Sequence, residues 1–345
     1  MSEWKECKLG DMVVFQRGHD LPKAEMIGGV IPVAGSNGII GYHNKATTKG
    51  PGITIGRSGN IGTPKFYKDD FWAHNTVLYI KDFKGSDEKF AFYFLNTFDF
   101  LGFNAGSAVP TLNRNHIHEI PVIVPPLPEQ RAIAGVLSSL DDKIDLLHRQ
   151  NRTLEGMAEA LWRKMFVEDA DPEWKKGKLG SFASFSNGKS RPQEVLNGTI
   201  PIYGGNGILG YTNCSNAEGE SIVVGRVGAY CGSLYIENRP VWITDNALHA
   251  KPIKEDFSKY LFYLLKNQDL NSMAEGSSHP LLTQTLLNSI EIDLPPESEI
   301  LFFGMYANTW FTKIIFNNDQ IRTLSHLRDT LLPKLMSGEI RVKYN

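Results

Sequence analysis

The feature that most constrains this chain is an internal repeat, because its second half restates its first about 170 residues later. The longest matching run covers residues 31–42 and returns as residues 200–211, with Ile-Pro, Asn-Gly and Gly-Tyr at the same places in both. Gly56-Arg57 likewise returns as Gly225-Arg226. A duplication of this length predicts one structural unit used twice, with its own hydrophobic core in each copy. The 345 residues therefore indicate two domains of ordinary size.

Each copy changes character once along its length. It opens on short runs of β-branched and aromatic residues, such as residues 53–55 and 221–224, which are separated by glycine and asparagine. Such runs are typical of strands and turns. A proline cluster then precedes a long stretch with helical periodicity, at residues 125–128 in the first copy and 295–296 in the second. Because proline suits the first turn of a helix, each copy is expected to be a β-rich domain followed by one long helix.

The predicted fold class is α+β, with two β-rich mixed domains separated by two long helices and related by an internal pseudo-two-fold repeat. The expected boundaries are 1–127 for the first domain, 128–168 for the first helix, 169–296 for the second domain, and 297–345 for the second helix with its C-terminal tail. A helix of about 40 residues would be roughly 60 Å long.

Both predicted helices carry apolar residues spaced alternately by four and three, which is the spacing of a coiled-coil seam. Asparagine interrupts the seam once in each helix. The seam residues of the first helix are Ile133, Leu137, Leu140, Ile144, Leu147, Asn151, Leu154 and Leu161. Those of the second helix are Trp310, Ile314, Asn317, Ile321, Leu324, Leu331 and Leu335.

The two asparagines indicate the direction of the pairing. In one antiparallel register Asn151 faces Asn317 and Ala158 faces Trp310, so that polar meets polar and small meets large. In a parallel pairing Asn151 would face Ile321, and an unpaired buried amide costs about 1–3 kcal/mol. An antiparallel coiled coil is therefore predicted.

One seam position conflicts with this register. Arg328 lies opposite Leu140, where an aliphatic residue is expected. A long arginine side chain can keep its stem on apolar surface while its charged head reaches solvent, and the register leaves Arg328 unexplained unless it does so.

Composition places the chain among soluble proteins. Residues 1–10 lack a basic segment followed by an apolar one, and no apolar run approaches the roughly 20 residues that span a bilayer. Its three cysteines form no C-x-x-C pair, which argues against a disulfide framework or a cysteine-rich zinc site. A cytoplasmic location without a membrane partner is expected. The net charge of -2 gives nucleic-acid binding no support.

Three stretches resemble a known family. Residues 106–112, Gly-Ser-Ala-Val-Pro-Thr-Leu, and residues 124–133, Val-Pro-Pro-Leu-Pro-Glu-Gln-Arg-Ala-Ile, are similar to the hallmark segments of Type I restriction-modification specificity subunits. Residues 332–340 are similar to the usual ending of that family. Together with the repeat, the resemblance extends over the whole chain. The sequence departs from the family at Val109 and His279, where glutamine is common.

The resemblance implies a non-catalytic, sequence-specific DNA-binding subunit. In that family each recognition domain reads one half of an asymmetric bipartite site in double-stranded DNA, and the helical spacer docks methyltransferase subunits, of which two are expected. Restriction subunits are a further candidate partner, and the complete assembly is a DNA adenine methyltransferase and ATP-dependent endonuclease. No cofactor is expected on this chain, so S-adenosylmethionine, ATP and Mg²⁺ would belong to the partners.

Loops of small polar residues around an arginine suit contacts with base edges and phosphates. The candidate DNA contacts of the first domain are Ser36, Asn37, Arg57, Ser58, Asn60, Ser107, Asn113 and Arg114. Those of the second domain are Asn206, Arg226, Ser277, Ser278, His279 and Gln284. A structural interpretation stays open for each, because glycines build tight turns, arginines pair with carboxylates, and Asn-Gly pairs form ordinary hairpins.

Enzyme motifs are incomplete in this sequence. The run 187–190, Asn-Gly-Lys-Ser, imitates the end of a phosphate-binding loop, but Ala183 stands where that loop requires glycine. The nine histidines show no metal-ligand spacing such as H-E-x-x-H. No catalytic or metal-binding residue is therefore expected. The alternative function is a duplicated β-rich scaffold that binds a protein or glycan and has no DNA role.

Overall fold

The computed structural model describes residues 4–103, 111–276 and 280–343. It divides into two compact units: unit 1 is Met1–Leu146 with Gln320–Asn345, and unit 2 is Leu147–Asp319. Each unit combines one β-rich domain with a stretch of both long helices. The borders between the units therefore lie inside the helices.

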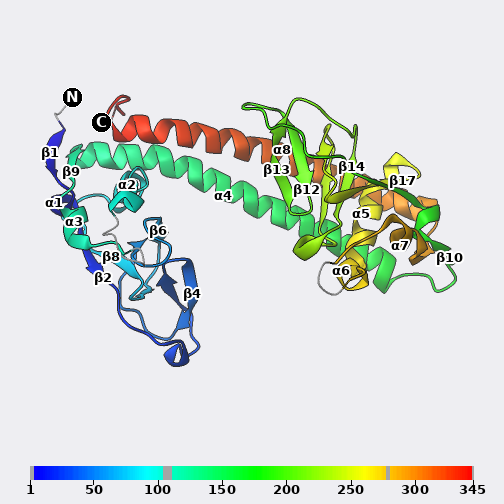
Figure 1. The fold of residues 1–345 in the computed structure, drawn as a ribbon, viewed down its shortest axis with the longest axis horizontal. Coiled ribbons are helices and arrows are strands. Elements are labelled where there is room, and N and C mark those ends of the chain that lie inside the picture. The colour runs from blue at the N-terminus through cyan, green and yellow to red at the C-terminus, as the bar shows by residue number, and fades with distance from the viewer. Residues whose placement is uncertain (1–3, 104–110, 277–279, 344–345) are drawn as a thin grey trace. The chain divides into compact units, whose positions relative to one another are not determined.

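The described residues of unit 1 form three small sheets (Figure 1). Strands β1 (Lys5–Lys8) and β9 (Pro121–Val124) form an antiparallel pair. The four-stranded sheet has the order β2 (Val14–Arg17), β8 (Val77–Asp82), β5 (Gly52–Gly56), β6 (Pro64–Tyr67). The three-stranded sheet has the order β4 (Gly38–His43), β3 (Ile31–Gly35), β7 (Trp72–Ala73).

Short helices complete the domain of unit 1. They are α1 (Leu9–Met12), η1 (Lys23–Glu25), α2 (Glu88–Leu95), η2 (Phe100–Phe103) and α3 (Arg114–His118). Asp87 starts α2, because its carboxylate accepts the Phe90 amide at 2.9 Å. Phe90 is fully buried in the same core as Ile53 and Ile55 of β5. Burial of one such aromatic side chain contributes roughly 1.5–3 kcal/mol to folding.

Unit 2 repeats the three sheets strand by strand. Its antiparallel pair is β10 (Lys175–Lys178) with β18 (Glu291–Leu294). Its four-stranded sheet has the order β11 (Ala183–Asn187), β17 (Ala247–Pro252), β14 (Ser221–Gly225), β15 (Leu234–Glu237). Its three-stranded sheet has the order β13 (Gly207–Thr212), β12 (Ile200–Gly204), β16 (Trp242–Ile243). The bulge of the β3–β4 hairpin also recurs in the β12–β13 hairpin. The predicted internal repeat is confirmed at the level of topology.

The helices of unit 2 enclose an aromatic core. They are η3 (Lys164–Glu168), a π-helical turn, η4 (Leu179–Ser181), η5 (Gly228–Tyr230), η6 (Glu255–Phe257), α5 (Ser258–Asn267), α6 (Leu270–Met273) and α7 (Gln284–Ser289). Phe166 packs edge-to-face on Tyr260 of α5, with ring centroids 4.8 Å apart. Aromatic pairs of this geometry add roughly 0.5–1.5 kcal/mol beyond their area burial.

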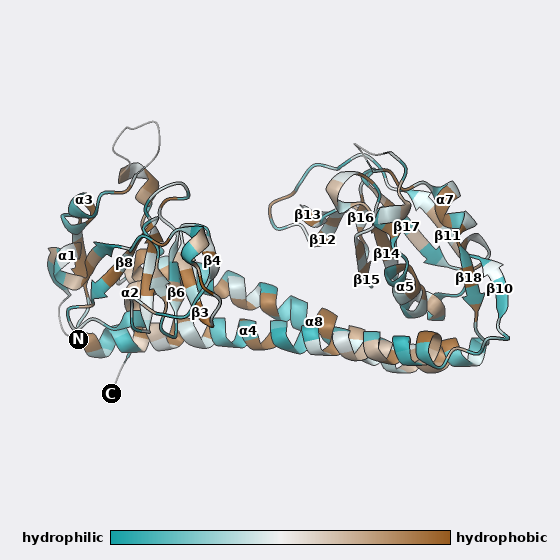
Figure 2. Ribbon diagram, turned by 90° about the horizontal axis from the view of Figure 1, so that it is seen from below, coloured by the Kyte–Doolittle hydropathy of each residue, from teal (hydrophilic) through white to brown (hydrophobic). Residues whose placement is uncertain are grey.

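The long helices are α4 (Leu127–Arg163) and α8 (Glu297–Met336). Within each unit their segments lie side by side and antiparallel (Figure 1), and apolar residues alternate with polar ones along both (Figure 2). The predicted seam residues are all buried or half-buried. The helices also enter the domain cores, because Ile133 and Leu335 belong to the core of unit 1, and Ala158 and Phe303 to that of unit 2.

The asparagine pair confirms the predicted antiparallel register. The Asn317 amide donates to Asn151 Oδ1 at 2.8 Å, and Asn151 Nδ2 donates to Asn318 Oδ1 at 2.7 Å. Asn151 and Asn317 are 7% and 0% exposed. Both asparagine side chains thus bind a partner across the seam, and of their amide atoms only Asn317 Oδ1 is buried without a partner among the described residues.

Arg328 forms an ion pair with a residue of α4. Its guanidinium donates to Asp141 Oδ1 at 2.7 Å, one residue along α4 from Leu140. The Tyr93 hydroxyl donates to the other oxygen of Asp141 at 2.5 Å. The Arg328 side chain is also 31% exposed, so it reaches solvent in part, and the carboxylate beside the seam is a second partner that the heptad pattern does not predict.

Candidate nucleic-acid interface

Several loops of unit 1 meet around Thr76, in the turn between β7 and β8. The amides of Arg57 and Ser58 donate to the Thr76 carbonyl at 2.8 and 3.3 Å. The Ser36 amide donates to the Thr76 hydroxyl at 3.3 Å, and His74 Nδ1 lies 3.0 Å from the same hydroxyl. Predicted contact residues from two separate loops, Ser36 in one and Arg57 with Ser58 in the other, are thus brought to one place.

A further segment, residues 111–114, joins this group. Thr111 forms an antiparallel bridge with Ser58, and the Leu112 amide donates to the Arg57 carbonyl at 2.9 Å. Because these bonds are made by backbone groups, they position the loop whatever its side chains are. We name this assembly loop cluster 1, which consists of residues 17–20, 36–37, 57–60, 74–76 and 111–114.

The two polar residues that end loop cluster 1 have different roles. The Asn113 side chain accepts the Asn115 amide at 3.0 Å and caps α3, so its oxygen is used within the protein. Arg114 is the first residue of α3 and is exposed. Of these two predicted contacts, Arg114 has the freer side chain.

Arg57 is half-buried and weakly held. Among the described residues its side chain makes one long hydrogen bond, to the Asn75 carbonyl at 3.5 Å. Burial lowers the pKa of its guanidinium, and the positive charge of Arg17 lowers it further. No carboxylate of the described chain pairs with Arg57, so the structural interpretation in which it neutralises a carboxylate finds no support here. Its N–H donors are left for a ligand.

The glycines that flank the arginines have a structural role. A Cβ on Gly56 would lie 1.9 Å from the Asn60 carbonyl oxygen, and one on Gly225 would lie 2.3 Å from that of Tyr230. Both distances are far below van der Waals contact, so only glycine permits the tight loop that follows β5 and β14. The Gly-Arg pair therefore combines a glycine that builds the loop with an arginine that the loop presents.

Unit 2 builds the same arrangement around Arg226. The Arg226 amide donates to the Asn246 carbonyl at 3.1 Å, and the Leu282 amide donates to the Arg226 carbonyl at 2.9 Å. Val227 and Leu281 form an antiparallel bridge. We name this assembly loop cluster 2, which consists of residues 187–190, 205–206, 226–230, 244–246 and 280–284.

The side chains of loop cluster 2 hold one another. Arg226 Nη1 donates to Asn187 Oδ1 at 3.1 Å, while the buried Arg226 Nε has no partner in the described part of the chain. In the amide orientation that satisfies both of its groups, Gln284 donates to the Phe185 carbonyl at 3.0 Å and accepts the Asn187 amide at 3.2 Å. Gln284 is therefore bound to strand β11 instead of pointing freely to a ligand.

The other candidate contacts differ in how they are placed. Asn37 and Asn206 are exposed at the tips of matching hairpins, and Asn60 is exposed in the loop after β5. Ser107, Ser277, Ser278 and His279 lie outside the described residues. Contact with DNA stays a prediction for all of these positions.

Sequence reasoning missed Arg17 and Asn187, the last residues of β2 and β11. Each lies beside the arginine of its loop cluster, as the pKa of Arg57 and the hydrogen bond of Arg226 show. They differ between the copies, so a search for matching motifs passes over them. A comparison of the two copies for differences next to shared motifs could have found them.

The proline-rich hallmark segment anchors the start of α4. Glu129 is 0% exposed and its carboxylate accepts from Arg341 at 2.5 and 2.7 Å and from the Trp4 indole at 3.2 Å. Gln130 Nε2 donates to the Pro125 carbonyl, and its oxygen accepts the Asp87 amide, both at 2.9 Å. These residues therefore have a structural role in unit 1.

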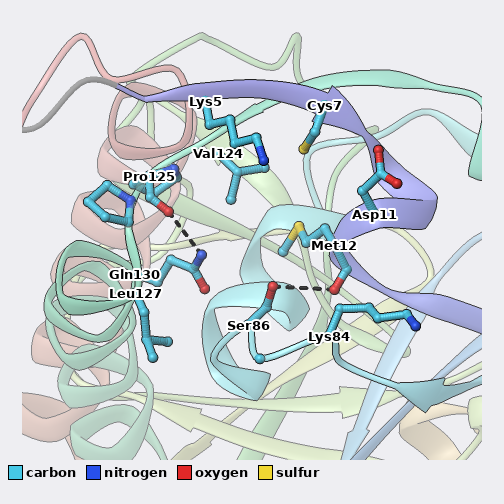
Figure 3. Close-up of a pocket in the computed structure, with 12 residues that line it drawn as sticks. Lys5, Cys7, Asp11, Met12, Lys84, Ser86, Val124, Pro125, Leu127 and Gln130 are labelled. Carbon is cyan, nitrogen blue, oxygen red and sulfur yellow. Dashed lines mark hydrogen bonds between the residues drawn. The ribbon is translucent and has the colours of Figure 1, made fainter.

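A cavity of about 360 Å³ lies beside Gln130 (Figure 3). Lys5 and Cys7 of β1, Lys84 before α2, and Pro125 are among the residues that line it. In the described residues no group of three or more His, Cys, Asp or Glu side chains is placed to hold a metal ion. Over the same residues, no helix is long and apolar enough to cross a membrane.

Comparison with known proteins decides the family. The model of the Type I restriction modification DNA specificity domain matches residues 1–156 and again residues 172–324. The chain belongs to this family. Its two specificity domains are the two copies of the repeat, so each carries one loop cluster.

Two relatives of this chain are themselves described as Type I specificity subunits. The specificity subunit of the Type I restriction enzyme MjaIX of Methanocaldococcus jannaschii is 25% identical over 288 residues, which are 70% of this chain and 65% of the relative. The chain thus spans slightly less than two thirds of that relative. A putative Type I specificity subunit of Mycoplasma pneumoniae is 22% identical over 97% of this chain and 96% of its own length.

A solved structure shares the fold of the specificity domains. The S subunit of a Type I restriction-modification system from M. genitalium superposes with a TM-score of 0.70 at 20% identity, and the match covers 96% of each chain. The predicted α+β class with duplicated domains and long helices is confirmed by this likeness.

Proposed function

We propose that this chain is the specificity subunit of a Type I restriction-modification complex. Each specificity domain binds one half of an asymmetric, bipartite site in duplex DNA, and the helix pair docks methyltransferase subunits. The observation that carries the proposal is the duplicated loop cluster, in which the same backbone bonds present Arg57 and Arg226 amid different side chains. One scaffold with two sets of side chains suits two different half-sites.

Exposed apolar residues on α8 support the docking role of the helices. Phe302, Met305 and Tyr306 are 50%, 58% and 42% exposed, and the rings of Phe302 and Tyr306 touch with centroids 5.3 Å apart. Contiguous apolar surface of this kind marks protein contact sites. Two methyltransferase subunits are expected because the chain is duplicated, and restriction subunits are a further partner.

The chain itself is proposed to be non-catalytic. S-adenosylmethionine would be held by the methyltransferase partners, and ATP and Mg²⁺ by restriction subunits. The cytoplasm is the expected location, since the DNA and these partners are found there. A net charge of -2 is low for a DNA-binding protein, so the partners are expected to supply part of the phosphate attraction.

The test is to co-express this chain with the methyltransferase subunit encoded beside it, in a host without other DNA methylation, and to map modified adenines by sequencing. The proposal expects methylation in a split, asymmetric motif that disappears when this chain is omitted. A control variant with Lys81→Gln, outside both loop clusters, should leave the motif unchanged. A soluble complex that methylates nothing would favour the protein- or glycan-binding scaffold.

A further inference from the structure

The two loop clusters differ in charge at three matched positions. The strand-end position is the last residue of β2 or β11. The loop position follows the glycine that ends β5 or β14, and the helix position is the first residue of α3 or α7. Loop cluster 1 has arginine at all three, and loop cluster 2 has arginine at the loop position alone. The residues are Arg17, Arg57 and Arg114 in the first cluster, and Asn187, Arg226 and Gln284 in the second.

The sheet register shows that these positions are structurally equivalent. Arg17 pairs with Leu78 of β8, and Asn187 pairs with Leu248 of β17, its counterpart in the repeat. The helix positions follow side-chain caps, which are Asn113 in α3 and Thr283 in α7. The difference is therefore one of side chains on a shared backbone.

The arginines of the first domain are confined to this cluster. Residues 1–127 contain three arginines, all of them in loop cluster 1, although the same segment carries lysines in many other places. The guanidinium group binds phosphate and guanine with two parallel hydrogen bonds, which the lysine ammonium cannot form. Because the arginines of this segment occur in loop cluster 1 alone, we infer that the planar guanidinium group is needed there.

Within loop cluster 1 these charges are poorly compensated. The positive charge of Arg17 acts on Arg57 and lowers its pKa, second to burial. Arg17 has a carboxylate partner in Asp20 at 3.6 Å, but the two side chains are 52% and 75% exposed, and such pairs contribute about 0–1 kcal/mol. A bound polyanion would relieve the repulsion between Arg17 and Arg57.

Loop cluster 2 has the opposite character, because its amides fix its single arginine. Asn187 accepts from the Arg226 guanidinium, and Gln284 is bound to the backbone of β11 next to Asn187. An arginine that is oriented before binding loses less conformational entropy when it meets a base edge or phosphate.

We infer, on the basis of the proposed function, that the first domain supplies most of the salt-dependent attraction to DNA through Arg17, Arg57 and Arg114, whereas the second domain holds its half-site with an oriented Arg226. Segment charge agrees with this division. Lysine plus arginine against aspartate plus glutamate is 13 against 12 in residues 1–127, but 11 against 14 in residues 169–296.

The experiment converts loop cluster 1 to the residues of loop cluster 2. The complex of the full chain with its methyltransferase is titrated with a duplex that carries the mapped bipartite site, between 50 and 200 mM salt. The double variant Arg17→Asn, Arg114→Gln should flatten the plot of log affinity against log salt by about 2, because each lost phosphate contact removes roughly one unit of slope. The methylated motif should stay the same.

The matched control removes two charges from the same domain at exposed positions outside the cluster. The double variant Lys81→Gln, Lys89→Gln should leave the salt slope of the wild-type complex unchanged. Arg226→Ala should lower affinity at every salt concentration, flatten the slope by at most about 1, and relax the methylated motif in one half.

Two failures are distinguishable. A wild-type complex that shows no salt-dependent binding to the duplex would overturn the proposed function and the inference together. A wild-type complex that binds normally, with equal slopes in the arginine and lysine double variants, would overturn the inference alone.

Discussion

The two units hold the same helix pair by different chemistry. Tyr93 of unit 1 and Tyr263 of unit 2 occupy matched positions, but Tyr93 donates to the carboxylate of Asp141, while Tyr263 donates to a backbone carbonyl of α4 at 3.2 Å. Asp141 in turn pairs with Arg328. The counterparts of this ion pair in the repeat are Phe311 and Ala158, which are both buried in the core of unit 2.

The difference shows that one backbone accepts either an ion pair or packed rings where its long helices contact its domain. We call these contacts the charged brace, Tyr93 with Asp141 and Arg328, and the aromatic brace, Phe303 with Phe166 and Tyr263. In unit 1 the residues of α4 that enter the domain core before Asp141 are aliphatic, as at Ile133 and Leu137. Unit 2 fills the matching space with rings, and Phe303 packs edge-to-face on Phe166 and Tyr263 at 5.8 and 5.9 Å. A half-exposed ion pair contributes little net free energy, so unit 2 should depend more steeply on single side chains.

The largest expected effect is on the aromatic brace. Phe303→Ala should destabilise unit 2 by about 3–5 kcal/mol, because the residue is fully buried and its truncation leaves a cavity. Chemical denaturation followed by tryptophan fluorescence measures the loss. The matched control is Phe302→Ala, one residue away and 50% exposed, which should cost less than about 1 kcal/mol. Equal losses would show that the brace does not depend on ring packing.

Substitutions of the asparagine pair test whether this polar contact stabilises unit 2 or only specifies the register of the two helices. Asn317→Leu should cost about 1–3 kcal/mol, because the buried Asn151 then faces an aliphatic wall. The double variant Asn151→Leu, Asn317→Leu should recover most of that loss, since two apolar partners leave fewer unpaired amides. Denaturation midpoints of four proteins, which are the wild type, Asn151→Leu, Asn317→Leu and the double variant, measure the coupling. Additive losses would contradict a direct interaction across the seam.

A smaller effect is expected at the charged brace of unit 1. Asp141→Asn removes the partner of Arg328 and weakens the acceptor for Tyr93, at a cost of about 1 kcal/mol, because the ion pair is partly exposed. The loss should shrink at high salt, which screens the pair in the wild type. A loss as large as that of Phe303→Ala would remove the distinction between the two braces.

The smallest effect is a dependence on alkaline pH. Burial and the neighbouring Asp141 raise the pKa of Tyr93 above its ordinary value, so folding favours the protonated hydroxyl. That stabilisation is fully present below the unfolded pKa of about 10 and is lost as pH rises above it. Tyr93→Phe should therefore flatten the fall of stability above pH about 10. Tyr306→Phe, at an exposed position, is the control and should leave that fall as in the wild type.

Most of the architecture could be predicted from the sequence because it depends on local periodicity. The repeat predicts equivalent domains, the four-three spacing predicts the helix seam, and Asn151 with Asn317 selects the antiparallel register. These inferences need only the geometry of a helix and the cost of an unpaired buried amide. The arginines of the Gly-Arg loops were also visible as a shared motif.

Tertiary structure alone decided which loop side chains meet. Ser36 and Arg57 both bind Thr76, and Gln284 binds β11, whereas the sequence showed these residues only as candidates in separate loops. Arg17 became visible as the neighbour of Arg57 only when β2 was paired with β8. The physical reason is that periodicity is a property of a single segment, whereas a recognition surface is formed where several segments end, and its position is set by hydrogen bonds and packing between residues far apart in the chain.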